Sequence, residues 1–190
     1  MKKLLLIFLS GLLVACATMP PTNTDNICAT FKENEDWYKN AKHAYTRWGV
    51  PIAVQMAIMH QESHFVADAQ PPRTWLLGFI PWSRPSSAYG YAQALDETWA
   101  QYLNSVGSWT AERDDFADAT DFIGWYSYVS HRKLGIPKND AKRLYLAYHE
   151  GHKGYAKGSH LRKAWLRRVA NKVEQRARLF AQQLGQCAVN

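Results

Sequence analysis

Helical periodicity is the feature that most constrains the fold of this chain. Apolar side chains recur every three to four positions along most of the sequence, which is typical of amphipathic helices. No segment of convincing length alternates polar and apolar residues as a half-buried strand would. The pattern, with glycine and proline at its boundaries, predicts helices over residues 31–48, 51–63, 96–106, 115–134, 139–148 and 161–184. A long loop at 68–89 and a turn-rich segment at 151–159 separate them. We therefore expect a mainly α fold in one domain.

The first 15 residues have the features of a secretory signal. Two lysines precede the largely apolar run Leu4–Val14, which is too short to span a bilayer because a spanning helix needs about 20 residues. The run ends in Leu13-Val14-Ala15-Cys16, which resembles the lipobox of bacterial lipoproteins. That resemblance implies that Cys16 receives the lipid and becomes the mature N-terminus. The alternative is an ordinary signal peptide with a chance cysteine.

A polar tether follows the expected lipidation site. Residues 17–26 include Pro20-Pro21 and cannot bury a core. We expect a signal peptide over 1–15, a lipidated tether over 16–30 and the folded domain over 31–190. The residue after the cysteine is Ala17 rather than aspartate. By resemblance to Gram-negative lipoproteins, this implies anchoring to the outer membrane, with the domain in the periplasm.

Two further cysteines lie at opposite ends of the folded part, Cys28 and Cys187. Export would place both in an oxidising compartment, where disulfides persist. Chain termini often lie close together in a domain. We therefore predict that Cys28 and Cys187 form a disulfide that joins the first helix to the last. The alternative is a pair of free thiols.

The chain is basic, with a formal charge of +7. Basic charge often indicates nucleic-acid binding, but export argues against that partner. Peptidoglycan carries carboxylates and also suits a basic surface, although a solvated helix face explains most of these charges. We expect a monomer that needs no cofactor. The excess of positive charge falls in the C-terminal third, at Arg162, Lys163, Arg167, Arg168, Lys172, Arg176 and Arg178.

One glutamate stands out as a candidate acid. On the predicted 51–63 helix, Val54 and Ile58 lie one helical step apart, and Glu62 takes the next step on the same apolar stripe. Burial raises the pKa of a carboxyl group, which suits a general acid near neutral pH. The alternative is a helix-end glutamate that faces solvent.

Two other clusters follow in order, Gly90-Tyr91-Ala92-Gln93 and Ala147-Tyr148-His149-Glu150-Gly151. Together with Glu62-Ser63, they resemble the motifs of the lytic transglycosylase family, which shares its fold with goose-type lysozyme. The resemblance covers roughly residues 37–184. It departs at Tyr91-Ala92, where the family usually has Leu-Met, and at His149, where it usually has asparagine.

The resemblance implies a role for each matching position. Glu62 would be the catalytic acid and then the base, and Ser63 would orient Glu62 or the substrate. Gln93 would line the floor of the cleft, and Tyr148 would hold Glu62 or the adjacent sugar. The other expected substrate-binding residues are Gly90, which turns the backbone at Gln93, Tyr91 and His149. Gly151 would let its helix end beside the cleft.

A second catalytic carboxylate is not evident, although most glycosidases use two. By the family resemblance, the substrate's own N-acetyl group and 6-hydroxyl replace the missing partner. The enzyme would then cleave the MurNAc-GlcNAc β-1,4 bond of peptidoglycan and leave a 1,6-anhydro sugar. The aspartates considered for the second role are Asp68, Asp96, Asp114, Asp115, Asp118 and Asp121, and Asp118 and Asp121 read first as the polar face of a helix.

Three alternatives stay open. His60 and His64 have the i, i+4 spacing of metal ligands, with His149 and His152 as further nitrogens, so a metal hydrolase is conceivable. The His-Glu-x-x-His order of zinc proteases is absent, however, and we expect no metal. The chain could also be a non-catalytic peptidoglycan-binding lipoprotein, or a muramidase that hydrolyses the same bond.

The 68–89 loop is unusually apolar for a solvent loop. It could pack on the body, form a cleft wall that stacks on sugar rings, or touch a lipid surface, and we favour the cleft wall. Its apolar residues are Trp75, Leu76, Leu77, Phe79, Ile80 and Trp82.

Overall fold

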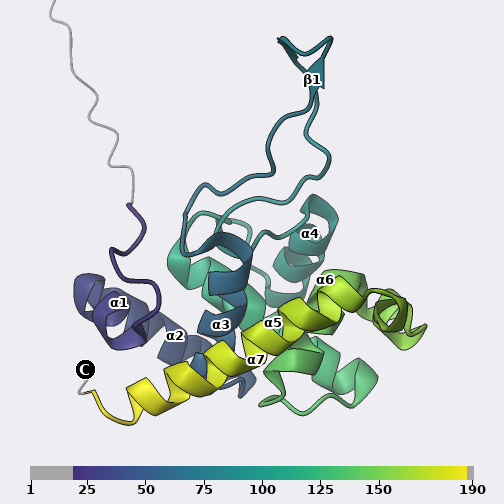
Figure 1. Cartoon of the computed structure of the whole chain (residues 1–190). Helices are drawn as coiled ribbons and strands as arrows, with labels where there is room; N and C mark the ends of the chain where they lie inside the picture. Colours follow the sequence, from purple (N-terminus) through teal and green to yellow (C-terminus); the bar gives the residue numbers. More distant parts are fainter. Residues whose placement is uncertain (1–18, 188–190) are drawn as a thin grey trace, which may run out of the picture.

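The computed structural model describes residues 19–187 and confirms a mainly helical fold (Figure 1). The signal peptide and Cys16 lie outside the described residues. The seven helices of residues 19–187 are α1 (Ile27–Glu33), α2 (Glu35–Trp48), α3 (Ile52–Ser63), α4 (Asp96–Val106), α5 (Phe116–Leu134), α6 (Ala141–Ala156) and α7 (Ala164–Leu184). A 3-10 turn, η1 (Ser159–Arg162), precedes α7, and β1 (Trp75–Leu76) pairs antiparallel with β2 (Ile80–Pro81).

Helix α3 lies at the centre of the body, where it packs against α2, α5, α6 and α7 (Figure 1). All residues from Ala53 to His60 are buried, so α3 is enclosed on every side rather than along the single stripe that the sequence pattern predicted. A helix that is covered all round needs apolar or small residues at nearly every position. The one polar exception before His60 is Gln55, whose amide donates to the Val50 carbonyl at 2.7 Å.

Three predicted helices differ in their bounds, and one of them is α7, which begins at Ala164 rather than at residue 161 because residues 159–162 form η1. The predicted 31–48 helix is two helices, because α1 ends at Glu33 and Asn34 leaves the helical conformation with φ −129° and ψ 81°. The predicted 139–148 helix extends to Ala156, through a kink at Gly151 with φ 70° and ψ 157°. Residues 151–156 are therefore helical rather than turn-rich, because the glycine bends the helix without ending it.

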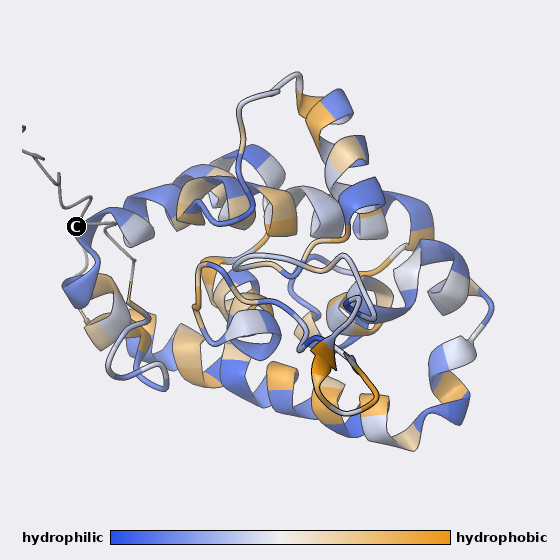
Figure 2. Ribbon diagram, turned by 90° about the horizontal axis from the view of Figure 1, so that it is seen from above, coloured by the Kyte–Doolittle hydropathy of each residue, from blue (hydrophilic) through white to orange (hydrophobic). Residues whose placement is uncertain are grey.

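The 68–89 segment forms an arm that projects away from the body and ends in the β1–β2 hairpin (Figure 1). In the view from above, much of the ribbon of the hairpin has the orange colour of hydrophobic residues (Figure 2). Its apolar side chains are exposed and do not pack on the body. Within residues 19–187, no helix has both the length and the hydropathy to span a membrane.

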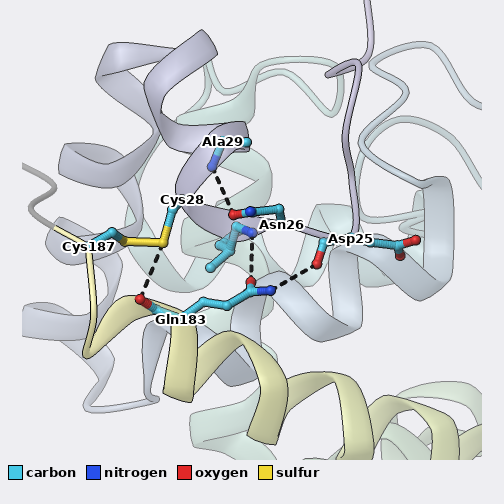
Figure 3. Close-up of a disulfide and its surroundings, with 7 residues drawn as sticks. Asp25, Asn26, Cys28, Ala29, Gln183 and Cys187 are labelled. Atoms are coloured by element: carbon cyan, nitrogen blue, oxygen red, sulfur yellow. Dashed lines mark hydrogen bonds between the residues drawn. A yellow bond between two sulfur atoms is a disulfide. The ribbon is translucent and has the colours of Figure 1, made fainter.

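The two ends of the described chain are joined by a disulfide between Cys28 and Cys187, as predicted (Figure 3). The Gln183 side chain reinforces this junction, because it accepts from the Ile27 backbone N–H at 2.9 Å and donates to the Asp25 carbonyl at 3.2 Å. Ile27 is fully buried. The packed body thus begins at about residue 27, so the expected tether boundary at residue 30 is a few residues too late.

Candidate active site

Glu62 lies in the last turn of α3, one residue before its end. The residue is partly buried, and its carboxyl group is enclosed enough for desolvation to raise its pKa from 4.5 to about 8. A hydrogen bond with Tyr145 opposes this shift without reversing it. The Glu62 carboxyl is therefore protonated at neutral pH, the state that a general acid requires.

Tyr145 is a site residue that the sequence analysis missed. It comes from the buried face of α6, and its hydroxyl contacts the Glu62 carboxyl. Tyr148, one turn later, was expected to hold Glu62, but its hydroxyl donates to the Ala92 carbonyl at 2.6 Å. Tyr145 precedes Tyr148 by three positions, so both face the same side of the helix. This spacing is the feature of the sequence that could have indicated Tyr145 as a neighbour of Tyr148 on one helix face.

Ser63 forms its hydrogen bond within its own helix. Its side chain is buried, and its hydroxyl donates to the Met59 carbonyl one turn back in α3 at 3.3 Å. This bond satisfies the hydroxyl within its own helix. Ser63 therefore helps to close the last turn of α3, and its expected role in orienting Glu62 or the substrate stays a prediction.

Gly90 and Gln93 form a tight turn that is fixed by close backbone contacts. Gly90 has φ +80°, and a Cβ at this position would lie 2.0 Å from the Arg113 carbonyl oxygen, so only glycine fits. The Gln93 amide donates to the carbonyls of Ala69 at 2.7 Å and Gly90 at 3.0 Å. Gln93 itself holds φ 47°, a left-handed conformation that these two bonds stabilise.

Tyr91 was expected to bind substrate, but the structure places it in the core rather than in the pocket lining. Its side chain is 2% exposed and belongs to the aromatic core. The ring packs edge-on against Trp37 and Phe116, whose own rings are stacked 3.9 Å apart. An aromatic residue follows Gly90 here because the turn directs that side chain inward.

A pocket of about 210 Å³ lies beside this turn. It contains three of the expected residues, Gln93, Tyr148 and His149, together with Gly151 at the kink of α6. Glu62 is not in the lining, but it is close enough to Tyr148 for its charge to raise the pKa of that phenol, after desolvation, well above the ordinary value. The full lining is Gln93, Ala94, Leu95, Thr98, Phe122, Tyr126, Tyr148, His149, Glu150 and Gly151.

Comparison with protein families matches residues 4–187 to the family described as Transglycosylase SLT domain. The chain belongs to this family. Comparison with curated proteins gives no match. Membership connects the chain with peptidoglycan and with lytic-transglycosylase-type function, and it accords with the mainly helical, lysozyme-like fold.

The pocket of this transglycosylase SLT domain is lined by one carboxylate, Glu150, which was not among the aspartates considered for a second catalytic role. Its side chain is only 3% exposed. Desolvation opposes its ionisation, but hydrogen bonds from Lys163, Ser159 and His149 outweigh it and lower the pKa of Glu150 to about 2. The Lys163 ammonium lies 2.7 Å from the carboxylate. Glu150 is thus an ionised, fully engaged group that anchors η1 and α7 to the pocket.

The aspartates considered earlier have other roles in this SLT domain. Asp121 is buried rather than on a polar helix face, and it accepts hydrogen bonds from Arg47, Trp48 and Tyr102. Asp118 accepts from the Glu112 backbone N–H at 2.9 Å. The bonds of Asp121 hold α2, α4 and α5 together. The remaining four aspartates are exposed: Asp68, Asp96, Asp114 and Asp115.

The histidines do not assemble a metal site in residues 19–187, where no group of three or more suitable side chains occurs. His60 and His64 have ring centres 4.5 Å apart and face Lys172 and Arg176 of α7. His152 instead bonds Ser130 at 2.9 Å, and His149 bonds Glu150. The Asp25 carboxylate also lies 3.7 Å from the Nε2 atom of His60 and forms an ion pair with Arg176.

Proposed function

We propose that this protein is a peptidoglycan lytic transglycosylase in which Glu62 is the single catalytic acid and base. The observation that carries the proposal is the enclosed Glu62 carboxyl near the end of a buried helix, where it contacts Tyr145 and where desolvation raises its pKa to about 8. A carboxyl that stays protonated at neutral pH can protonate a leaving glycosidic oxygen. Gln93, Tyr148 and His149 in the adjacent pocket are the proposed substrate contacts.

The proposed reaction cleaves the MurNAc-GlcNAc β-1,4 bond. Glu62 gives its proton to the glycosidic oxygen as that bond breaks, while the N-acetyl group of the sugar stabilises the anomeric carbon. The 6-hydroxyl of the same sugar then attacks that carbon, and the Glu62 carboxylate takes the hydroxyl proton. The product is a 1,6-anhydro-MurNAc end, and no water is consumed. Tyr145 would hold the carboxyl in place through both proton transfers.

Hydrolysis is the second candidate, because Glu150 is an ionised carboxylate in the pocket wall. A hydrolase would need such a group to activate water or attack the sugar. The carboxylate of Glu150 is already engaged by Lys163, Ser159 and His149, which lowers its basicity. This engagement favours the lyase reaction over the muramidase reaction.

The proposal for location rests on the leader sequence. Cys16 at the end of the apolar run would carry the lipid, and Ala17 after it would direct the protein to the outer membrane, with the catalytic domain in the periplasm. The disulfide between Cys28 and Cys187 accords with an oxidising compartment. We propose that the protein acts there as a monomer.

Digestion of purified sacculi tests the reaction. The wild type should release muropeptides with anhydro ends, identified by mass, and Glu62→Gln should lower the rate by about 10²-fold or more. Glu97→Gln, which changes an exposed glutamate of α4, is the matched control. Products with only reducing ends would establish hydrolysis instead. Binding to sacculi without any cleavage would support the non-catalytic alternative.

A further inference from the structure

The β1–β2 hairpin displays a set of apolar side chains that neither the core nor the pocket uses. Leu77 and Phe79 at its apex are 76% and 71% exposed, and Trp75 and Trp82 flank them at 59% and 56%. Monomeric proteins seldom expose such a contiguous group unless it binds something. We propose that this hairpin inserts its apex into the interfacial region of a phospholipid membrane that carries anionic headgroups.

The backbone conformation at the apex of the hairpin disfavours the large apolar residue that is found there. Leu77 has φ 54° and Gly78 φ 80°, so the turn needs the left-handed conformation at two successive positions. Asparagine, aspartate or glycine is favoured at such positions, whereas leucine is strained there and is also exposed to water. The turn thus presents a large apolar side chain at a position where the fold favours a small polar one. A lipid environment would bury that side chain.

The charge around the hairpin matches an anionic surface. Arg73 precedes the hairpin and Arg84 follows it, and no aspartate or glutamate occurs between Asp68 and Asp96. The exposed Arg73 can reach phosphate groups while the apex lies at the boundary with the acyl chains, and Arg84, which donates to the Pro71 carbonyl, adds positive charge beside it. Tryptophan is enriched at the same membrane depth, because its ring is apolar and its N–H is polar.

The length of the hairpin limits the depth of insertion. Each strand has two residues, and the ladder continues only through Thr74, which donates to Ser83 and accepts from Trp82. A short two-stranded ribbon has unpaired backbone groups at both edges, which cannot enter the hydrocarbon core. The apex would therefore enter only the boundary between headgroups and acyl chains.

The position of the hairpin separates it from the pocket. It projects from the body at the end of a long arm (Figure 1), and none of its residues lines the pocket, whose first residue in the chain is Gln93. The expected cleft wall is therefore not supported by the lining of this pocket. The described chain also begins on the upper side of the body in Figure 1, the side from which the hairpin projects. An N-terminal anchor and the hairpin could thus meet one membrane.

Quenching of tryptophan fluorescence by brominated lipids tests the proposal with the full chain in vesicles of phosphatidylglycerol and phosphatidylcholine. Trp75→Phe and Trp82→Phe together should lower the quenching at least twofold. Trp109→Phe removes a tryptophan that is also exposed but lies outside the hairpin, and it should leave the quenching unchanged. Unchanged quenching in the hairpin variant would overturn the proposal, even if the protein remains bound through its N-terminus.

A second variant separates lipid insertion from other occupants. Leu77→Asp with Phe79→Asp changes only exposed side chains, so it should abolish quenching of the hairpin tryptophans, whereas Leu179→Asp on α7 should not. Quenching in phosphatidylcholine alone should be weaker than with phosphatidylglycerol. A fluorescence change of Trp75 and Trp82 with soluble glycan fragments but not with lipid would show a sugar-binding wall. Hairpin-dependent crosslinking of two chains would show self-association, and either result would overturn the proposal.

Discussion

Replacing the Glu62 carboxyl by an amide should make the protein more stable at neutral pH while it removes activity. The folded protein keeps Glu62 protonated up to a pKa of about 8, whereas the unfolded chain ionises it above about 4.5. Ionisation thus favours the unfolded state as the pH rises above 4.5, and this loss of stability is complete above the folded pKa. Glutamine cannot ionise, so Glu62→Gln escapes the loss.

The size of the effect follows from the two pKa values. Between pH 4.5 and pH 7 the interval is 2.5 pH units, and each unit corresponds to about 1.36 kcal/mol, so the wild type should lose roughly 3 kcal/mol relative to Glu62→Gln. Below pH 4 the pH-dependent difference should vanish, and above pH 8 it should reach a plateau. All other titrating groups are common to both proteins and cancel in the difference, as long as the folds agree.

Urea unfolding at a series of pH values from about 4 to 9 measures this difference directly. The free energy of unfolding of Glu62→Gln minus that of the wild type should rise with pH, and Glu97→Gln should give a flat line. A flat line for Glu62→Gln as well would refute the reasoning, because the Glu62 carboxyl would then titrate in the folded protein as it does in water. A difference that falls with pH would mean that the carboxylate, not the acid, is the stabilised form.

Three further predictions concern the surroundings of Glu62 and the closure of the fold. Tyr145→Phe removes a hydrogen bond that lowers the pKa of Glu62. The alkaline limb of the pH profile of kcat/KM should therefore move to higher pH. An alkaline limb at unchanged pH would contradict the contact between Tyr145 and Glu62. Gly90→Ala should lower the free energy of unfolding by roughly 3 kcal/mol, because its Cβ meets the Arg113 carbonyl. Gly78→Ala has the same φ of +80° but its Cβ meets open space, so the free energy of unfolding should fall by only about 1 kcal/mol. Equal losses in urea titrations of the two variants would reject the clash. Cys28→Ser with Cys187→Ser removes a disulfide between residues that are 159 positions apart in the sequence. The free energy of unfolding, measured without reductant, should fall by about 2–5 kcal/mol. An unchanged midpoint of urea unfolding would show that the disulfide constrains the unfolded chain little.

The sequence predicted the helices well where periodicity and boundary residues agree. The ends of α3, α4 and α5 fall within one residue of the predicted ranges, because Pro51, Gly107 and Gly135 mark them. The division of the first helix at Asn34 was missed, because asparagine is tolerated in helices and the apolar pattern continues across it. Gly151 was expected to end its helix, but the packing of α6 against α7 carries the helix through the kink.

The candidate site was predictable as far as local motifs extend. Glu62, Gln93, Tyr148 and His149 come from segments whose order in the chain identifies the family, and the structure brings the last three to one pocket. Tyr91 lies within such a motif but faces the core, since a motif does not say on which side of the backbone each side chain points. The spacing of Tyr145 and Tyr148 indicates a shared helix face, but the contacts of Tyr145 with Glu62 and of Glu150 with Lys163 are tertiary and do not follow from the sequence.

The burial of α3 connects the fold to the proposed chemistry. Because the helix is enclosed from Ala53 to His60, its C-terminal end can present Glu62 with little access to water, and the same enclosure that stabilises the core raises the pKa of the acid. Ionisation of the enclosed Glu62 carboxyl lowers the stability of the fold. The Cys28–Cys187 disulfide offsets part of this loss, because it joins α1 to the end of α7, the helix that covers α3. Reduction of this bond should therefore admit water to α3 and lower the pKa of Glu62, so that activity falls at a lower pH than in the oxidised protein. If the alkaline limb of kcat/KM stays in place after Cys28→Ser with Cys187→Ser, the enclosure of Glu62 does not depend on the closed termini.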